Sequence, residues 1–341
     1  MEHATYFETF LKNEVNLSQS SLDLLVERVD AVYDALKQDD TIGSLITGKI
    51  PQGSWPHRLI IKPKAGGDFD ADFLLEMDQE QDWEPKTYPN EVYNALHRHS
   101  TYSKQGHGRK CRCVYLKYAP KNNIGCHLDI VPFVTLQDGR RVIVNRDDNE
   151  WEPPYGSTDP QAFSNWVYRR DEITEKHFRK VVRLMKFLRD ERGSFSGVKS
   201  VVLTTVLGMQ VTELRALSPD YCRNLPTALL NLVEDLDTWL QRNPTKPSLP
   251  NPSNDGTNFD HRWAQETYAN FRDRIHSIAA TMRDAYDETD KGKSVKTWQK
   301  LFGSKFSPPG SAAAKTAGAA VVAATISSPQ RSRSQRSGRA G

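Results

Sequence analysis

The spacing of apolar residues predicts both helices and strands in the first half of the chain. In residues 18–37, apolar side chains recur every three or four positions behind a serine-rich start, which is typical of an amphipathic helix with an N-cap. Residues 50–75 run through Pro, Gly and Ser into alternating positions, a pattern that predicts a turn, a short helix and a strand at 69–75. A helix is also expected at 90–99, and strands at 111–118, 126–134 and 140–144.

From about Asp159 onward the apolar spacing becomes helical. Helices are expected at 173–190, 200–211, 222–241 and 262–286, and the apolar segment SVVLTTVLGMQV predicts that the second of these is buried. The expected fold class is therefore α+β, with a mixed sheet in the first half and a mainly helical second half.

The last 34 residues differ in composition from the rest of the chain. Residues 308–341 are mostly Ala, Ser, Gly and Arg with no aromatic side chain, so they bury too little surface to offset the entropy of ordering. The predicted organisation is a first lobe at 1–158, which includes a long N-terminal helix, a helical lobe at 159–307 and a disordered tail at 308–341.

The net charge of +3 is unevenly distributed. Five basic residues and no acidic residue follow Ser307, which leaves 41 basic and 43 acidic residues in the body of the protein. Proteins that bind long nucleic acids usually present a basic face that neutralises phosphates. This balance does not indicate such a face, and no long nucleic acid is expected as a partner.

The sequence offers no membrane or secretion signal. No apolar run approaches the ~18 residues that a membrane span needs, and the first residues, MEHATYFETF, lack a basic region followed by an apolar one. The four cysteines are too few for a disulfide framework in a chain of 341 residues. These features predict a cytoplasmic protein without a membrane partner.

The candidate chemistry lies in three aspartates. Asp70 and Asp72 are separated by one residue in FDADF, so a strand projects both carboxylates from one face, and Asp129 in CHLDIVPF lies in a second expected strand. Three close carboxylates repel one another unless hard cations lie between them. Two Mg²⁺ ions about 3.5–4 Å apart, or Mn²⁺ in their place, would activate an attacking hydroxyl and stabilise a leaving pyrophosphate. The competing interpretation is a solvated strand face that includes Asp68.

The segment Gln52-Gly53-Ser54 supplies a candidate phosphate site. A Gly-Ser turn offers backbone N–H groups and a small hydroxyl that can approach the β and γ phosphates of a nucleoside triphosphate. The turn and the aspartates together indicate chemistry on NTPs.

A zinc site is a weaker alternative. Cys111, Cys113, Cys126 and His127 carry suitable ligand atoms, but C-x-C on a strand is an ordinary core pattern and the chain has no CxxC motif near them. His127 shares a strand face with Asp129 and is either a structural histidine or a support for the carboxylates.

The order of a GS turn, a DxD strand and a third Asp between apolar residues resembles the polymerase-β-like nucleotidyltransferase superfamily. The later segments VVRLMKFLRD, KSVVLTTVLG, NPSNDGTNFDHRW and WQKLFGSKF look like those of the bacterial cGAS/DncV-like nucleotidyltransferases, or CD-NTases, which carry a SMODS domain. The resemblance covers roughly residues 5–307.

This resemblance implies a bilobal protein with a polymerase-β-like core, an OAS/cGAS-like helical lobe and a central cleft. It implies a synthase of cyclic di- or trinucleotide second messengers in CBASS anti-phage defence. The implied substrates are NTPs, with ATP first and GTP or others as further candidates, and a downstream effector responds to the product. By match, Ser54 contacts the donor triphosphate, Asp70, Asp72 and Asp129 hold the metals, and Lys186 and Ser200 contact nucleotide.

Several residue assignments remain open. Many relatives have a threonine a few residues after the Gly-Ser turn, whereas this chain reads WPHRLII, so His57 or Arg58 could donate to phosphate instead. Lys186 could be a solvated lysine on the face opposite the apolar stripe, and Ser200 could be a helix N-cap.

Two functional alternatives accompany the synthase interpretation. One is a linear nucleotidyltransferase, including an adenylyltransferase that acts on RNA or a small molecule. The other is an inactive family member that serves as a binding scaffold, which the intact acidic triad disfavours.

The sequence ends in the glycine-containing segment SGRAG. A flexible terminus with Gly341 as its last residue could enter the narrow site of a ubiquitin-activating type of enzyme, and some relatives with a similar SKF-x-P-P-G segment are conjugated by a fused E1/E2-like partner. The hypothesis is that Gly341 is a conjugation site. The alternative is an unremarkable disordered end or, through its arginines, a weak nucleic-acid tether.

Overall fold

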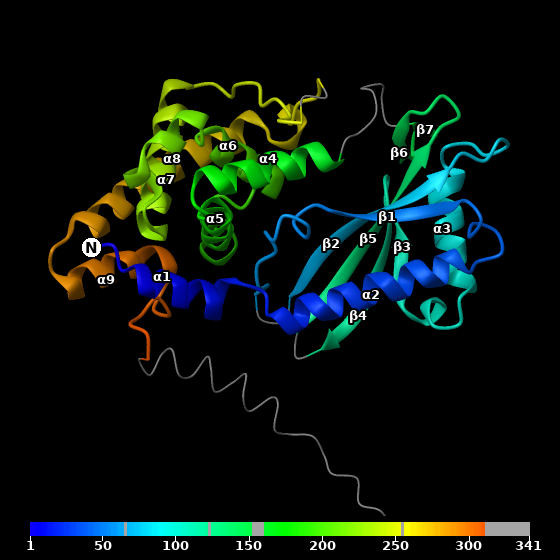
Figure 1. Cartoon of the computed structure of the whole chain (residues 1–341), viewed down its shortest axis with the longest axis horizontal. Helices are drawn as coiled ribbons and strands as arrows, with labels where there is room; N and C mark the ends of the chain where they lie inside the picture. Colours follow the sequence, from blue (N-terminus) through cyan, green and yellow to red (C-terminus); the bar gives the residue numbers. More distant parts are fainter. Residues whose placement is uncertain (65–66, 122–123, 152–159, 254–255, 311–341) are drawn as a thin grey trace, which may run out of the picture.

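The computed structural model describes residues 1–64, 67–121, 124–151, 160–253 and 256–310. Two groups of elements lie side by side, a sheet with two covering helices and a bundle of helices (Figure 1). Each group has its own hydrophobic core. The expected α+β architecture is therefore confirmed, with a mixed sheet beside a helical half.

The sheet is formed by β1 (Ile46–Gln52), β2 (Asp68–Asp78), β3 (Gly106–Arg109), β4 (Val114–Lys121), β5 (Ile124–Thr135), β6 (Arg141–Asn145) and β7 (Glu150–Trp151). Its main strand order is β1-β2-β5-β4-β3. Strand β6 pairs with β5 and with β7. Strands β2 and β5 run parallel, whereas the other pairs are antiparallel. The long parallel pair forms the centre of the sheet.

Alternation along β2 determines which side chains enter the core. Phe69, Ala71 and Phe73 are buried in the same core as α2 (Gln19–Lys37) and α3 (Thr87–Arg98). Because successive strand residues point to opposite faces, Asp70 and Asp72 project from the other face. That face is turned toward the helical half (Figure 1).

The helical half contains α4 (Pro160–Ile173), α5 (Phe178–Arg192), α6 (Ser200–Met209), α7 (Leu225–Arg242), α8 (Gln265–Asp287) and α9 (Lys291–Phe302). Helix α6 is buried over most of its length, as its apolar sequence predicts. The helices expected at 222–241 and 262–286 are confirmed within a few residues as α7 and α8.

The N-terminal helix α1 (Ala4–Phe10) packs with the helical half. The Phe7 ring makes edge contacts with Trp298, Phe302 and Phe306, with ring centroids 4.9, 5.6 and 4.8 Å away. Tyr6 and Phe10 belong to the same core. The chain therefore crosses from the helical core to the sheet before α2, although the sequence led us to place residues 1–158 together.

Three local expectations were wrong. No helix lies within 50–64 or 67–75, because β1 pairs with β2 up to Gln52 and turns follow it. The helix expected at 173–190 is interrupted, because Glu175 and Lys176 adopt left-handed φ values of 50° and 68°. The Thr174 hydroxyl accepts a hydrogen bond from the Phe178 amide at 2.8 Å, and α5 begins at Phe178 with His177 as its N-cap. The strand expected at 111–118 begins only at Val114.

No helix among the described residues is long and apolar enough to cross a bilayer. The predicted disordered tail lies outside the described residues from 311 onward, and so does residue 158, the expected lobe boundary.

Candidate active site

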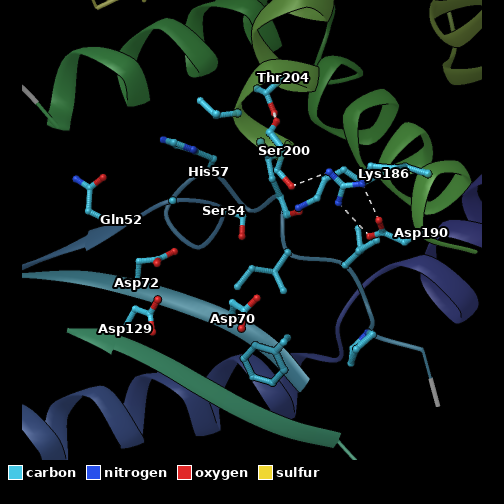
Figure 2. Close-up of a pocket in the computed structure, with 18 of the residues that line it drawn as sticks. Gln52, Ser54, His57, Asp70, Asp72, Asp129, Lys186, Asp190, Ser200 and Thr204 are labelled. Carbon is cyan, nitrogen blue, oxygen red and sulfur yellow. Dashed lines mark hydrogen bonds and ion pairs between the residues drawn. The ribbon is translucent and has the colours of Figure 1, made fainter. Parts of the chain in front are cut away.

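The central strands bring the three aspartates together. In the parallel register of β2 and β5, Asp72 lies opposite Asp129 and Asp70 lies opposite His127. Figure 2 shows the three carboxylates on the same side of these strands, below the turn that carries Ser54. Period-two alternation and one strand pairing are sufficient to create this cluster.

The Asp72 carboxyl has a raised pKa. Burial, together with the charges of Asp129 and Asp70, raises the pKa of its carboxyl to about 6. The Lys110 ammonium opposes this shift. The site therefore concentrates negative charge in a partly desolvated place, which is common where a protein binds a cation or does chemistry.

Two basic groups contact the other carboxylates. The Lys110 ammonium donates to both oxygens of Asp129, at 2.9 and 2.7 Å. The His127 ring lies between two acids, with Nδ1 3.1 Å from Oδ1 of Asp70 and Nε2 3.5 Å from Oδ1 of Asp129. His127 thus contacts the carboxylates, as one of the two sequence interpretations supposed.

The Gly-Ser turn lies directly against Asp72. Gly53 has a φ of +66°, and a Cβ atom added to it would lie 2.5 Å from Oδ2 of Asp72. Only glycine meets both the left-handed conformation and the close approach without strain. Strand β1 ends at Gln52, opposite Asp72, so the strand pairing itself delivers the turn to the acidic cluster.

A cavity of about 680 Å³ joins the sheet to the helical half, and its size suits a nucleotide-scale ligand. All the candidate residues within the described chain line it: Gln52, Gly53, Ser54, Asp70, Asp72, Asp129, Lys186 and Ser200. The sequence interpretation therefore selected residues from both halves that share one cavity.

Lys186 lies in a different environment from the one expected. Its side chain is buried at 5% exposure, and Nζ donates to the Leu59 carbonyl at 2.7 Å. Burial lowers the pKa of the ammonium to about 8. The solvated-lysine alternative and the expected location opposite the apolar stripe are both wrong, because Lys186 faces the cavity wall between the two halves.

Ser200 is the first residue of α6, and the N-cap is Lys199. The Ser200 hydroxyl accepts a hydrogen bond from Nη1 of Arg189 at 3.1 Å, and that arginine also pairs with Asp190 at 2.6 Å (Figure 2). The N-cap alternative is thus wrong, and the serine is oriented by an arginine that the sequence analysis did not select.

The candidate replacements for the missing threonine differ from each other. His57 is buried in the cavity wall, with Nε2 2.9 Å from the Ser164 hydroxyl, and burial lowers its pKa to about 4. It is therefore neutral at pH 7 and offers phosphate no charge. Arg58 lines a separate hollow behind the turn, formed with α2 and Arg183.

The acids fit hard divalent cations by the chemistry of their oxygens. In their present rotamers, the described His, Cys, Asp and Glu side chains do not form a group of three or more that could hold a metal ion. Asp129 is engaged by Lys110 and Asp70 by His127, so metal binding requires these carboxylates to exchange partners. Side-chain rotation suffices because the backbone register already places the acids side by side.

The cysteines of the zinc alternative are dispersed. Cys126 is buried in the sheet core on the face opposite His127, and Cys111 precedes β4 and contacts Asn145 through a 3.0 Å hydrogen bond. Cys113, in contrast, forms a hydrogen bond with Asp129, but the described residues contain no group of three or more His, Cys, Asp and Glu side chains that could hold a metal ion.

Lys110 was missed by the sequence analysis. It lies in GRKCRC between β3 and β4, and nothing in a single basic residue of a short loop predicts an ion pair with an acid 19 residues later. Only the antiparallel pairing of β4 with β5 brings it to Asp129.

Comparison with known proteins identifies the family. Residues 1–171 match the SMODS family, described as "Second Messenger Oligonucleotide or Dinucleotide Synthetase domain". The chain belongs to this family, whose members are nucleotidyltransferases that synthesise cyclic di- and trinucleotide second messengers. Metal dependence is general among nucleotidyltransferases of this kind.

Relatives with named activities are distant in sequence, and their names describe cyclic nucleotide synthases. The chain is 22% identical over 321 residues to a cyclic AMP-AMP-AMP synthase of Acinetobacter sp., which covers 93% of this chain and 88% of the relative. It is 25% identical over 198 residues to a probable cyclic AMP-AMP-GMP nucleotide synthase of Salmonella paratyphi B. That match spans 56% of this chain and only 48% of the Salmonella protein.

A solved structure of E. coli CdnC with ATP has the same fold. Its TM-score is 0.68 at 19% identity, and the match covers 89% of this chain and 99% of CdnC. The polymerase-β-like nucleotidyltransferase architecture expected from the sequence is therefore confirmed. CdnC has also been solved in a complex with a HORMA protein, which is a different kind of partner from the expected E1/E2-like enzyme. Gly341 lies outside the described residues.

Proposed function

We propose that this protein is a template-independent synthase that joins NTPs through phosphodiester bonds and cyclises the product. The observation that carries the proposal is the meeting of Gly53, Asp72 and Asp129 in one cavity that both halves line. Nucleotidyl transfer requires a turn that can bind the donor phosphates beside carboxylates that can bind metal ions.

In the proposed reaction, the 3′- or 2′-hydroxyl of one nucleotide attacks the α-phosphorus of another. A new P–O bond forms, the bond to the β-phosphate breaks, and pyrophosphate leaves toward Ser54 and the backbone of Gln52 and Gly53. Asp129 accepts the hydroxyl proton, directly or through water. A second transfer within the linear product closes the ring.

Asp70, Asp72 and Asp129 would hold two Mg²⁺ ions, with Mn²⁺ as an alternative. When bound, such ions neutralise phosphate charge and lower the pKa of the attacking hydroxyl. The protein supplies position: its strands fix the carboxylates and its turn fixes the donor phosphates, and this preorganisation is the main source of rate enhancement in phosphoryl transfer.

The helical wall of the cavity is suited to the nucleobase and the outer phosphates. Phe163 and Phe259 line it with ring centroids 6.3 Å apart, and aromatic faces of this kind stack on bases. Ser200, oriented by Arg189, and Lys186 supply polar groups on the same wall. ATP is the first candidate substrate, because relatives named for AMP-containing products align with this chain.

The test is incubation of the purified full chain with four labelled NTPs and Mg²⁺, followed by phosphatase treatment and separation of the products. A phosphatase-resistant cyclic product supports the proposal. A linear product with free phosphate ends supports the linear nucleotidyltransferase, and no product from any NTP combination supports the inactive scaffold. Each alternative contradicts the synthase.

We further propose, from the sequence, a cytoplasmic role in CBASS anti-phage defence, with an effector that responds to the cyclic product. The division at residue 158 and conjugation of Gly341 by an E1/E2-like enzyme also rest on sequence alone. Deleting Gly341 and probing cells that carry the neighbouring genes for covalent adducts tests the conjugation. Adducts that persist after the deletion would contradict it.

A further inference from the structure

The Gly53–Ser54 turn leads into a loop that the helical half holds from the other side. Three backbone carbonyls within residues 56–59 of this loop accept hydrogen bonds from side chains of α4 and α5. Tyr168 Oη donates to the Pro56 carbonyl at 2.7 Å, Nη1 of Arg183 to the Arg58 carbonyl at 2.6 Å, and Nζ of Lys186 to the Leu59 carbonyl at 2.7 Å. We call Tyr168, Arg183 and Lys186 the loop clamp.

The loop also has its own internal bonds. The Leu59 amide donates to the Ser54 carbonyl at 2.8 Å, and the Arg58 amide donates to the Trp55 carbonyl at 3.0 Å. These bonds connect the clamped carbonyls to the backbone of Ser54. A displacement of residues 58–59 is therefore transmitted to the serine.

Arg58 adopts a strained conformation at the centre of the loop. Its φ of 54° lies in the left-handed region, which is unfavourable for a residue with a Cβ atom. Such conformations persist where surrounding contacts hold them. The hydrogen bond from Arg183 to the Arg58 carbonyl is one such contact.

The clamp contains two cations: Lys186 is buried at 5% exposure, whereas Arg183 is half-buried and lines the hollow behind the turn. Burial lowers the pKa of Lys186 to about 8 and that of Arg183 to about 10. Among the described residues, the hydrogen bonds of both side chains go to these carbonyls, and neither side chain is in an ion pair. An unpaired buried cation is costly, so stability alone is a poor explanation for placing Lys186 against this loop.

We propose that the loop clamp positions the donor-phosphate turn. Tyr168 and Arg183 are positioning residues in the helical half that keep Ser54 in place relative to Asp72 in the sheet. The nearby hydrogen bond between His57 and Ser164 acts in the same direction. The inference rests on the proposed function for its catalytic meaning, because Ser54 is taken as the donor-phosphate contact.

The clamp assigns the helical half a role in catalysis beyond forming a cavity wall. Because Tyr168 and Arg183 contact backbone carbonyls, loss of either one displaces the turn without removing a group that the proposed function places against substrate. Substrate binding is then weakened while the carboxylates remain intact.

The experiment combines hydrogen exchange with kinetics on the full chain. Tyr168→Phe removes one hydroxyl from a side chain that is 37% exposed, so folding is preserved. Arg183→Met and the conservative Arg183→Lys probe the second contact. Tyr268→Phe is the matched control, since it removes a tyrosine hydroxyl that donates to a backbone carbonyl, that of Asn243 at 2.5 Å, within the helical half.

Without nucleotide, the amides of 58–59 should exchange about 10-fold faster in Tyr168→Phe than in the wild type, as loss of one net hydrogen bond implies. In Tyr268→Phe their exchange should be unchanged. With NTPs, Arg183→Met should raise KM for ATP about 10-fold with kcat within about threefold, and Arg183→Lys should recover part of the loss.

Unchanged exchange at 58–59 in both Tyr168→Phe and Arg183→Met overturns the clamp, as does equal acceleration in the Tyr268→Phe control. If Arg183→Met does not fold, Tyr168→Phe alone decides between these outcomes. Exchange needs no substrate, so the result stands even if the wild type forms no product, which would overturn the proposed function instead.

Discussion

A Cβ atom on Gly53 would lie 2.5 Å from Oδ2 of Asp72. Real Cβ atoms do not approach an oxygen that closely, so any side chain at residue 53 must displace either the turn or the carboxylate. The phosphate turn and the acidic cluster are therefore built as one unit. Strand pairing of Gln52 with Asp72 produces this contact.

Gly53→Ala should reduce product formation by at least about 10-fold while the protein still folds, because the change strains a left-handed φ and shifts Asp72. The matched control is Gly139→Ala. Gly139 also has a positive φ, of +83°, but an added Cβ meets nothing within 4 Å. Steady-state rates and thermal unfolding of both variants test this. Equal loss of activity in the two variants would show that backbone strain, and not the contact with Asp72, is responsible.

Asp72 should make the protein less stable as pH rises through the range 4–6 in the absence of metal. Its pKa is raised from 3.8 to about 6, so the folded state retains a proton that the unfolded state has lost, and stability falls across this range. At pH 7 the cost is fully present, and Asp72→Asn should remove it and raise the free energy of unfolding by about 1–3 kcal/mol. Urea unfolding in EDTA at pH 7 measures this, and a lower stability of the variant would be inconsistent with the argument.

Lys186 should weaken the fold at neutral pH and less so at high pH. Its pKa is lowered from 10.5 to about 8, so the unfolded state binds the proton more tightly, and stability rises with pH between 8 and 10.5. The wild type should therefore gain stability relative to Lys186→Met between pH 7 and pH 10. Lys186→Met should also raise KM for NTP. If the difference in free energy of unfolding between the wild type and Lys186→Met is the same at both pH values, and KM is unchanged, this interpretation is ruled out.

Lys110 should compete with divalent cations for Asp129. Lys110→Met removes the ammonium that contacts both oxygens of this carboxylate, so Mg²⁺ should bind several-fold more tightly while the metal-free protein melts at a lower temperature from unrelieved repulsion. The control is Lys117→Met. Both lysines lie over the Tyr115 ring, and Lys117 is exposed. Calorimetric titration with Mg²⁺ alone gives the affinity, and an unchanged or weaker value for Lys110→Met would refute the competition.

The sequence was sufficient to predict the acidic cluster, since strand alternation and one pairing place Asp70, Asp72 and Asp129 on one face. It was insufficient for contacts that depend on how the two halves meet. The hydrogen bond from Lys186 to Leu59 joins residues 127 apart, and no local pattern encodes it. A lysine between apolar residues of an amphipathic helix can be solvated or buried, and the sequence does not distinguish the two until the surface that packs against the helix is known.

Local conformation explains the other differences. Glu175 and Lys176 are ordinary helix formers, yet both adopt left-handed φ values just before α5 begins at Phe178, where the Phe178 amide bonds to the Thr174 hydroxyl. The loop after Gln52 was expected to contain a short helix, but the clamp from α4 and α5 binds its carbonyls instead. In the first case local hydrogen bonds override helix propensity, and in the second case hydrogen bonds from α4 and α5 hold the loop.

The most direct test of the account compares the wild type with the double variant Asp70→Asn, Asp72→Asn, each incubated with labelled ATP, GTP, CTP and UTP and Mg²⁺. The account predicts a phosphatase-resistant cyclic product from the wild type and none from the double variant, whose circular dichroism spectrum remains that of a folded protein. Wild-type turnover by the double variant, or no cyclic product from the wild type with any mixture of the four NTPs, would contradict it.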